Sequence, residues 1–237
     1  MLEPKVIYET EDFLAVDKPA GLQVHGAKIH KGSAARAAEP TLVDWLVKTY
    51  PQAASVGDDP ALRPGIVHRL DKGTSGVMLI AKTQAGFAYL KSLFQKHEVT
   101  KTYVALVRGV PKEKEGTIDA PIGIVNGTLK RSTRSSKMRK EAVTTYSVIK
   151  TVTLGNEKYA LLKVNPLTGR THQIRVHLAS IGHPVAGDRL YGPKKPDAPR
   201  LMLHAAAIAF APVPGSRITL EAALPKEFST GLSIAGG

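Results

Sequence analysis

The chain is organised around the stretch His68-Arg69-Leu70-Asp71-Lys72-Gly73-Thr74-Ser75-Gly76. Apolar runs precede it (Ile66-Val67) and follow it (Val77–Ala81), so we predict a loop between two strands. Asp71 is the candidate site residue, because the neighbouring cations favour a carboxylate and the glycines permit a tight, fixed loop. Taken alone, the same residues also fit a charged surface turn, since charged side chains are mostly exposed.

The composition indicates a globular protein with an anionic partner. The 237 residues suffice for one large domain or two small lobes, and no apolar run approaches the roughly 20 residues that span a bilayer. Lys and Arg number 33 against 20 Asp and Glu, and the net charge of +13 attracts polyanions. We find no long basic amphipathic helix, so we expect nucleic acid rather than a membrane as the partner.

The absence of cysteine excludes disulfides, thiolate metal ligands and cysteine nucleophiles. The chain begins with a strand-like segment and no charged-then-apolar leader, so we expect no export and a cytoplasmic location.

Hydrophobic periodicity predicts short strands and helices along the whole chain. We expect two hairpins, one of strands 6–8 and 13–16 and one of strands 144–152 and 158–164. Three single strands are expected at 101–107, 201–210 and 218–224. We expect three helices. The first begins at the N-cap Thr41, the second runs from 86 to 98, and the third begins near Thr171 and ends at Gly182.

The densest basic segment of the chain runs from Lys130 to Lys140. Six of its eleven residues are cationic: Lys130, Arg131, Arg134, Lys137, Arg139 and Lys140. We interpret this segment as a hairpin that contacts phosphates, although a solvated loop has the same composition. The loop from Lys28 to Arg36 and the pair Lys194-Lys195 are further candidate contacts to nucleic acid.

Several other chemistries lack their motifs. His172 and His177 are five residues apart, so they do not share one helix face and make a poor metal site. Neither a phosphate-binding loop, a dinucleotide-binding Gly-x-Gly-x-x-Gly, nor a Gly-x-Ser-x-Gly elbow occurs.

Two stretches together resemble the RluA family of RNA pseudouridine synthases: the loop around Asp71 and Gly169-Arg170-Thr171-His172-Gln173-Ile174-Arg175-Val176-His177. Supporting matches occur in the family's order at Asp17–Leu22, Lys101–Tyr103, Gly187-Asp188, Leu190–Gly192 and Leu203–Ala205, and the resemblance covers about residues 6–224.

The resemblance implies an α+β fold with a long, mainly antiparallel sheet in two lobes, surrounding helices and loops, and an RNA-binding cleft between the lobes. We expect residues 1–237 to form one catalytic domain. Many relatives carry an N-terminal RNA-binding domain, for which we see no room before Val6.

By the same resemblance, Asp71 attacks the target nucleoside, so that uracil detaches, rotates and rejoins through carbon 5. Arg175 would pair with the carboxylate and orient it. Tyr103 would stack on the flipped uracil and move a proton from carbon 5.

Three further positions match family residues around the nucleotide. Arg69 would fill the vacated stack or hold the flipped nucleotide, because extruding a base costs a few kcal/mol. Leu203 would supply an apolar wall, and Arg170 would either contact a phosphate or support its loop.

The isomerisation is redox-neutral, so we expect no cofactor and no metal. The resemblance implies a monomer that acts on rRNA, tRNA or both. Two alternatives stay open: an RNA-binding or RNA-chaperone protein with dispensable catalysis, and a hydrolase that releases free uracil.

Overall fold

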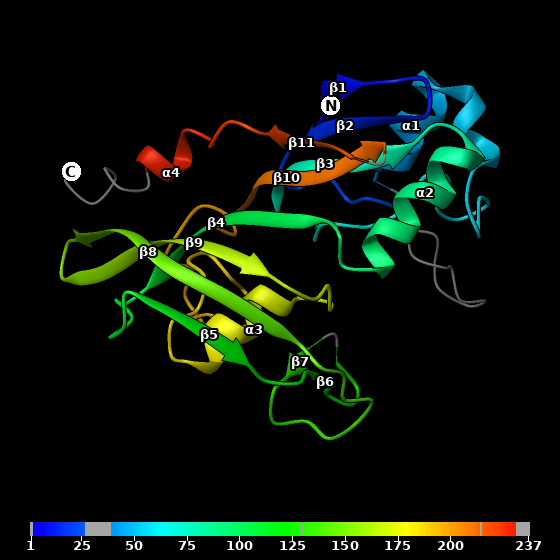
Figure 1. The fold of residues 1–237 in the computed structure, drawn as a ribbon. Coiled ribbons are helices and arrows are strands. Elements are labelled where there is room, and N and C mark those ends of the chain that lie inside the picture. Colours follow the sequence, from blue (N-terminus) through cyan, green and yellow to red (C-terminus); the bar gives the residue numbers. More distant parts are fainter. Residues whose placement is uncertain (1, 27–38, 129, 214, 231–237) are drawn as a thin grey trace. The chain divides into compact units, whose positions relative to one another are not determined.

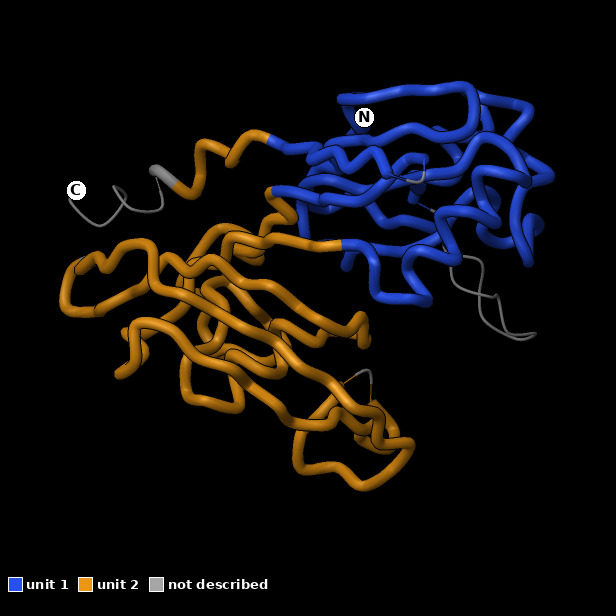
Figure 2. Tube along the Cα trace, viewed as in Figure 1, with its two compact units in different colours: residues 1–99, 207–222 blue, residues 100–206, 223–237 orange. Residues whose placement is uncertain are grey.

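The chain folds into two compact units, which Figure 2 distinguishes by colour. Unit 1 comprises residues 1–99 and 207–222, and unit 2 comprises residues 100–206 and 223–237. The computed structural model describes residues 2–26, 39–128, 130–213 and 215–230. Strand β10 (Leu203–Val213) begins in unit 2 and continues into unit 1, so the chain returns to the first unit near its end.

Unit 1 is built on strands β1 (Lys5–Glu9), β2 (Phe13–Lys18) and β3 (Ser75–Ala81), in the order β1-β2-β3-β10. The pairs β1–β2 and β2–β3 are antiparallel, and so is the pair of β10 with β11 (Ser216–Glu221). All seven residues of β3 are buried, which explains why it is a continuous apolar run rather than an alternating one.

Short helices accompany these strands (Figure 1): α1 (Leu42–Thr49), the 3-10 turn η1 (Pro51–Ser55) and α2 (Gln84–Gln95). A capping box starts α1, in which the Thr41 side chain accepts from the Asp44 amide and the Asp44 side chain accepts from the Thr41 amide. The N-cap predicted at Thr41 is therefore confirmed.

Unit 2 contains the order β4-β9-β8-β5, with β4 (Thr100–Arg108), β9 (Glu157–Pro166), β8 (Val143–Leu154) and β5 (Glu115–Asp119). The pairs β4–β9, β9–β8 and β8–β5 are antiparallel.

The remaining elements of unit 2 are a two-stranded sheet of β6 (Gly123–Ile124) with β7 (Arg131–Ser132), and the helices α3 (Gln173–Ser180) and α4 (Glu227–Thr230). Ile174 and Leu178 of α3 are buried in the core of this unit. The predicted α+β class and both predicted hairpins are confirmed.

Three predictions of local structure were wrong in detail. Ile66-Val67 is not a strand, because the chain turns at Gly65 (φ +68°) and only Ile66 forms a bridge, to Ile80 of β3. The helix expected at 86–98 ends at Gln95, and His97 follows in a left-handed conformation. The helix near Thr171 has His172 as its N-cap instead, at φ 58°.

The described part of the chain, residues 2–230 with its gaps, contains no helix both long enough and apolar enough to cross a membrane.

Candidate active site

The loop that carries Asp71 is attached to unit 1 at both of its ends. His68 Nε2 accepts a hydrogen bond of 2.9 Å from the Leu79 amide, and its ring stacks on Phe94 with centroids 4.4 Å apart. The neutral tautomer with its proton on Nδ1 meets this geometry, since Nε2 must accept. At the other end Thr74 and Ser75 are buried, and the Thr74 amide donates to the Asp71 carbonyl at 3.0 Å.

A buried lysine joins this loop to the turn after β2. Lys18 is 0 % exposed, and its ammonium donates to the carbonyls of Leu22 (2.8 Å), Pro19 (3.0 Å) and Lys72 (3.4 Å). The Gly21 amide donates to the same Lys72 carbonyl at 2.7 Å. These bonds compensate the cost of burying an ammonium group and fix the backbone next to Asp71.

The cations that flank Asp71 in the sequence contact other groups in unit 1. Lys72 forms an exposed ion pair with Glu39, and Arg69 Nη1 lies 2.9 Å from His25 Nε2. Asp71 itself is half-buried. The pairing predicted between Asp71 and Arg175 would join residues of different units and stays a prediction.

Arg175 of α3 forms a buried, two-pronged ion pair within unit 2. Its Nε and Nη2 donate to the two carboxylate oxygens of Asp188 at 2.7 and 2.8 Å, and the two residues are 9 % and 2 % exposed. Burial raises the pKa of Asp188, but Arg175 and the amides of Leu190 and Tyr191 outweigh it, so the pKa lies below its ordinary value.

The other predicted site residues of unit 2 occupy different surroundings. Tyr103 is half-buried on β4 beside the core, and Leu203 is buried at the start of β10. Arg170 is exposed, and its Nε donates to the Glu141 carbonyl at 2.9 Å. This contact is of the loop-supporting kind, while a phosphate contact of Arg170 stays a prediction.

The basic segment 130–140 pairs with residues outside it at both of its ends. Arg131 and Ser132 form β7, which pairs with β6, and Lys140 forms an antiparallel bridge to Ile122, with turns and irregular backbone between. The prediction of a hairpin across the segment was therefore wrong in extent. Arg131 is half-buried, and the other five cations are exposed, as are Lys194 and Lys195. The candidate loop from Lys28 to Arg36 lies outside the described residues.

Comparison with known proteins decides the family. The family model described as RNA pseudouridylate synthase matches residues 12–180. An uncharacterized RNA pseudouridine synthase of Aquifex aeolicus is 46% identical over 200 residues, which are 84% of this chain and 59% of that protein. Ribosomal large subunit pseudouridine synthase D of Pseudomonas aeruginosa is 37% identical over 98% of this chain and 72% of that protein.

The chain belongs to the RNA pseudouridine synthase family. Its resemblance to the RluA family is thereby confirmed, and this is a family of isomerases. The structure of human RNA Pseudouridylate Synthase Domain Containing 1 is similar with a TM-score of 0.77 and 26% identity, over 99% of this chain and 88% of the human one.

Two polar groups of unit 2, Asp188 and Lys101, were not singled out from the sequence. Asp188 appeared only as part of a matching dipeptide, and its pairing with Arg175 has no local signal because the residues lie on a turn and a helix. Lys101 was the other. Burial lowers its pKa to about 8, and its ammonium donates to the Thr168 carbonyl at 3.0 Å, which holds the loop before α3.

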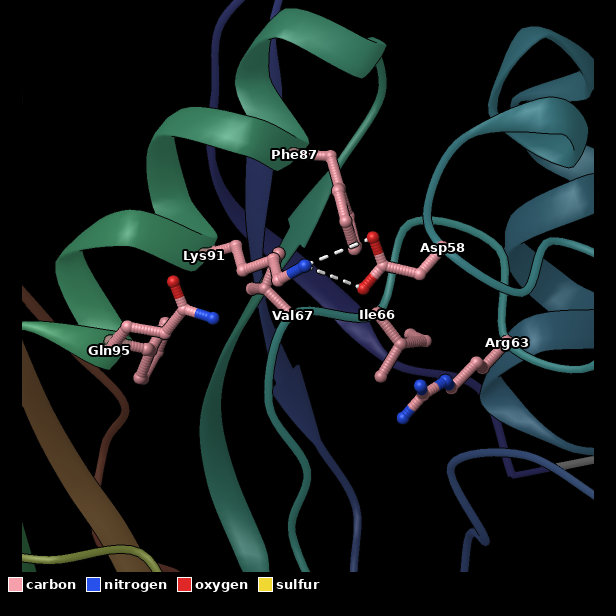
Figure 3. A pocket seen from close by; sticks show the side chains of 8 residues that line it. Asp58, Arg63, Ile66, Val67, Phe87, Lys91 and Gln95 are labelled. Atoms are coloured by element: carbon pink, nitrogen blue, oxygen red, sulfur yellow. Dashed lines mark hydrogen bonds and ion pairs between the residues drawn. The ribbon is translucent and has the colours of Figure 1, made fainter.

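A pocket of about 310 Å³ lies in unit 1, lined in part by Ile66 and Val67 (Figure 3). Across it, the Lys91 ammonium contacts the two Asp58 carboxylate oxygens at 2.8 and 3.0 Å. Phe94, which stacks on His68, is one of its lining residues. None of the predicted site residues lines this pocket, so we assign it no part in the reaction. Among the described residues, no cluster of His, Asp or Glu is arranged to hold a metal ion.

Proposed function

We propose that this chain isomerises specific uridines of rRNA, tRNA or both to pseudouridine, with Asp71 as the nucleophile. The observation that carries the proposal is the anchoring of the Asp71 loop. Bonds from His68 and Lys18 hold its backbone while the carboxylate stays half-buried. A nucleophile held in this way loses little freedom when the substrate binds.

The proposed reaction conserves every atom of the nucleoside. Asp71 attacks the target nucleoside, either at the base or at the ribose, and the bond between N1 and the ribose breaks. The uracil rotates, carbon 5 forms the new bond to the ribose, and the bond between Asp71 and the nucleoside breaks, which regenerates the carboxylate. Carbon 5 then loses its proton and N1 ends with one, so the reaction needs neither an oxidant nor a cofactor.

Arg175 and Tyr103 are the proposed partners of Asp71. The two bonds from Nε and Nη2 of Arg175 to the Asp188 carboxylate fix the plane of the guanidinium. A guanidinium held by one carboxylate is thus able to orient a second. Tyr103 is proposed to stack on the flipped uracil and to take the carbon-5 proton, with Leu203 as an apolar wall and Arg69 steadying the nucleotide.

RNA capture is proposed to use the exposed cations of the segment 130–140, together with the loop 28–36 and Lys194-Lys195. Non-specific attraction of this kind grows with the number of phosphates neutralised. We further propose that residues 1–237 act as one catalytic domain, as a monomer in the cytoplasm, where rRNA and tRNA are processed.

Mapping pseudouridines across total RNA from cells with and without this gene tests the proposal. We expect one or more rRNA or tRNA positions to lose pseudouridine without the gene and to regain it when the gene is restored. Identical maps would overturn the proposal in favour of an RNA-binding protein without catalysis. Free uracil in chromatograms of the treated RNA would instead identify a hydrolase.

A further inference from the structure

Tyr191 joins the beginning of the basic segment to the helix that carries Arg175. Its hydroxyl accepts a hydrogen bond of 2.9 Å from the Arg131 amide of β7. The same hydroxyl lies 2.9 Å from Nδ1 of His172, the N-cap of α3. The guanidinium carbon of Arg175 lies 5.1 Å from the centre of the Tyr191 ring, a cation–π distance.

The backbone of Tyr191 is tied to the same ion pair. Asp188 Oδ1, which accepts from Arg175, also accepts from the Leu190 amide at 2.9 Å and from the Tyr191 amide at 3.1 Å. The Asp188 carboxylate therefore fixes both Arg175 and Tyr191, whose ring covers the guanidinium. Tyr191 also packs against the small apolar cluster of Ile122, Ala142 and Val176.

The hydroxyl has little choice of partners in this arrangement. A phenol has one proton and two lone pairs, so it accepts from the Arg131 amide and donates to or accepts from His172. Burial raises the pKa of Tyr191, which keeps the phenol protonated near neutral pH. A displacement of β7 thus pulls on a hydroxyl that is also bonded to His172 at the start of α3.

We propose that Tyr191 is a positioning residue that couples RNA binding at the basic segment to the orientation of Arg175. Phosphates held by Arg134 and Lys137 fix the segment, the Tyr191 hydroxyl transmits its position to His172, and the ring holds the guanidinium. This inference rests on the proposed function, because it needs Arg175 to act on the Asp71 carboxylate.

Single-turnover kinetics of Tyr191→Phe test the coupling. The probe is a mixture of large-subunit rRNA and tRNA transcripts labelled with tritium at carbon 5 of uridine, and tritium release reports the reaction. We expect the rate constant at saturating RNA to fall about tenfold, as one lost hydrogen bond allows, while the Kd for the transcripts changes less than twofold. Tyr159→Phe is the matched control, because its hydroxyl contacts Asp197 and not the segment.

A double-mutant cycle with Arg134→Glu separates coupling from a general loss of structure. In the wild-type background we expect Arg134→Glu to lower both the affinity and the saturating rate constant. In the Tyr191→Phe background it should lower only the affinity, because the link to Arg175 is already broken. If Tyr191 had a purely structural role, Arg134→Glu and Tyr191→Phe would change the rate constant independently of each other.

The outcomes are distinguishable. If the wild type releases no tritium from any transcript, the proposed function fails and the inference with it. If the wild type is active but Tyr191→Phe keeps its rate constant, or the two effects multiply, only the inference is overturned. Should Tyr191→Phe fail to fold, His172→Asn replaces it in the cycle, because asparagine tolerates the left-handed backbone at that position.

Discussion

The Asp71 loop of unit 1 and the Arg175 helix of unit 2 are held in different ways. In unit 1, the side chain of His68 binds the backbone amide of Leu79 in β3, and the side chain of Lys18 binds the backbone carbonyl of Lys72 next to Asp71. In unit 2, Arg175 is held by another charged side chain, Asp188, with a tyrosine ring over it. The bonds to the backbone restrict the motion of the loop locally. In the ion pair, by contrast, each buried charge needs the other to offset the cost of its burial. Loss of one partner should therefore have a local effect in unit 1 and a larger effect on stability in unit 2.

The largest expected effect is that of Asp71→Asn, which tests the catalytic side of this comparison. Removing the nucleophile should lower tritium release from carbon-5-labelled RNA by at least about a thousandfold, with RNA affinity kept within about tenfold. Asp58→Asn, at an exposed carboxylate of the same unit, serves as the control and should retain activity. Normal turnover by Asp71→Asn would show that another group performs the attack.

Next comes Asp188→Asn, which removes one charge of the buried pair in unit 2. Leaving a buried guanidinium without this counter-ion should destabilise the fold by about 3 kcal/mol, measured by denaturant unfolding. Glu157→Gln is the control and should have little effect, because its pair with Arg108 is exposed. Equal effects of the two substitutions would show that the buried pair contributes no more to stability than the exposed one.

The pH dependence of this pair has a definite sign. The pKa of Asp188 is lowered in the folded protein, so its stabilising contribution is present above the unfolded-state value of about 4 and is lost as the pH falls through the folded value. The stability difference between wild type and Asp188→Asn should therefore shrink in acid below about pH 4.

A smaller effect is expected when the basic segment is reversed in charge. Arg131→Glu, Arg134→Glu and Lys137→Glu together should weaken RNA binding by about ten- to a hundredfold and make the slope of log K against log salt shallower by about 2 to 3. Reversing the exposed Lys112, Lys114 and Lys150 changes the net charge equally and is the control. An unchanged slope, or the same change in the control, would exclude the segment from the RNA interface.

The smallest expected effect is that of His68→Phe, which keeps a ring against Phe94 but removes the acceptor of the Leu79 amide. We expect a loss of about 1 to 3 kcal/mol in stability and a modest decrease in turnover. His97→Asn is the control, because His97 is exposed and asparagine accepts its positive φ. A turnover as low as that of Asp71→Asn would give His68 a direct role in the reaction.

Local patterns predicted the elements of the fold well where a periodic apolar run met a turn or cap signal. The N-cap Thr41 of α1 and the hairpin formed by β8 and β9 are examples. The prediction failed at Thr171, where the Gln173 side chain accepts from the Arg170 amide at 2.9 Å and the helix starts after a left-handed His172. A side chain that accepts a hydrogen bond from an amide earlier in the chain competes with an ordinary N-cap. Such a bond leaves no trace in the spacing of apolar residues.

Less of the candidate site than of the fold could be predicted from the sequence. The family of the chain was predicted from the motif around Asp71 and is confirmed, and the catalytic role of Asp71 stays a prediction. The partners Asp188 and Tyr191 were not predicted, because their contacts with Arg175 depend on how a turn folds over a helix. The contacts of Lys18 depend in the same way on the packing of two loops.

The burial of Lys18 has a consequence for the heat sensitivity of this chain. Its ammonium joins the carbonyls of Leu22 and Lys72, and Gly21 is bonded to the same Lys72 carbonyl. If one of these loops loosens alone, it leaves a buried ammonium short of acceptors, so the two loops are coupled. On warming, the surroundings of Asp71 should stay ordered until unit 1 itself melts, so inactivation and melting should follow a single curve.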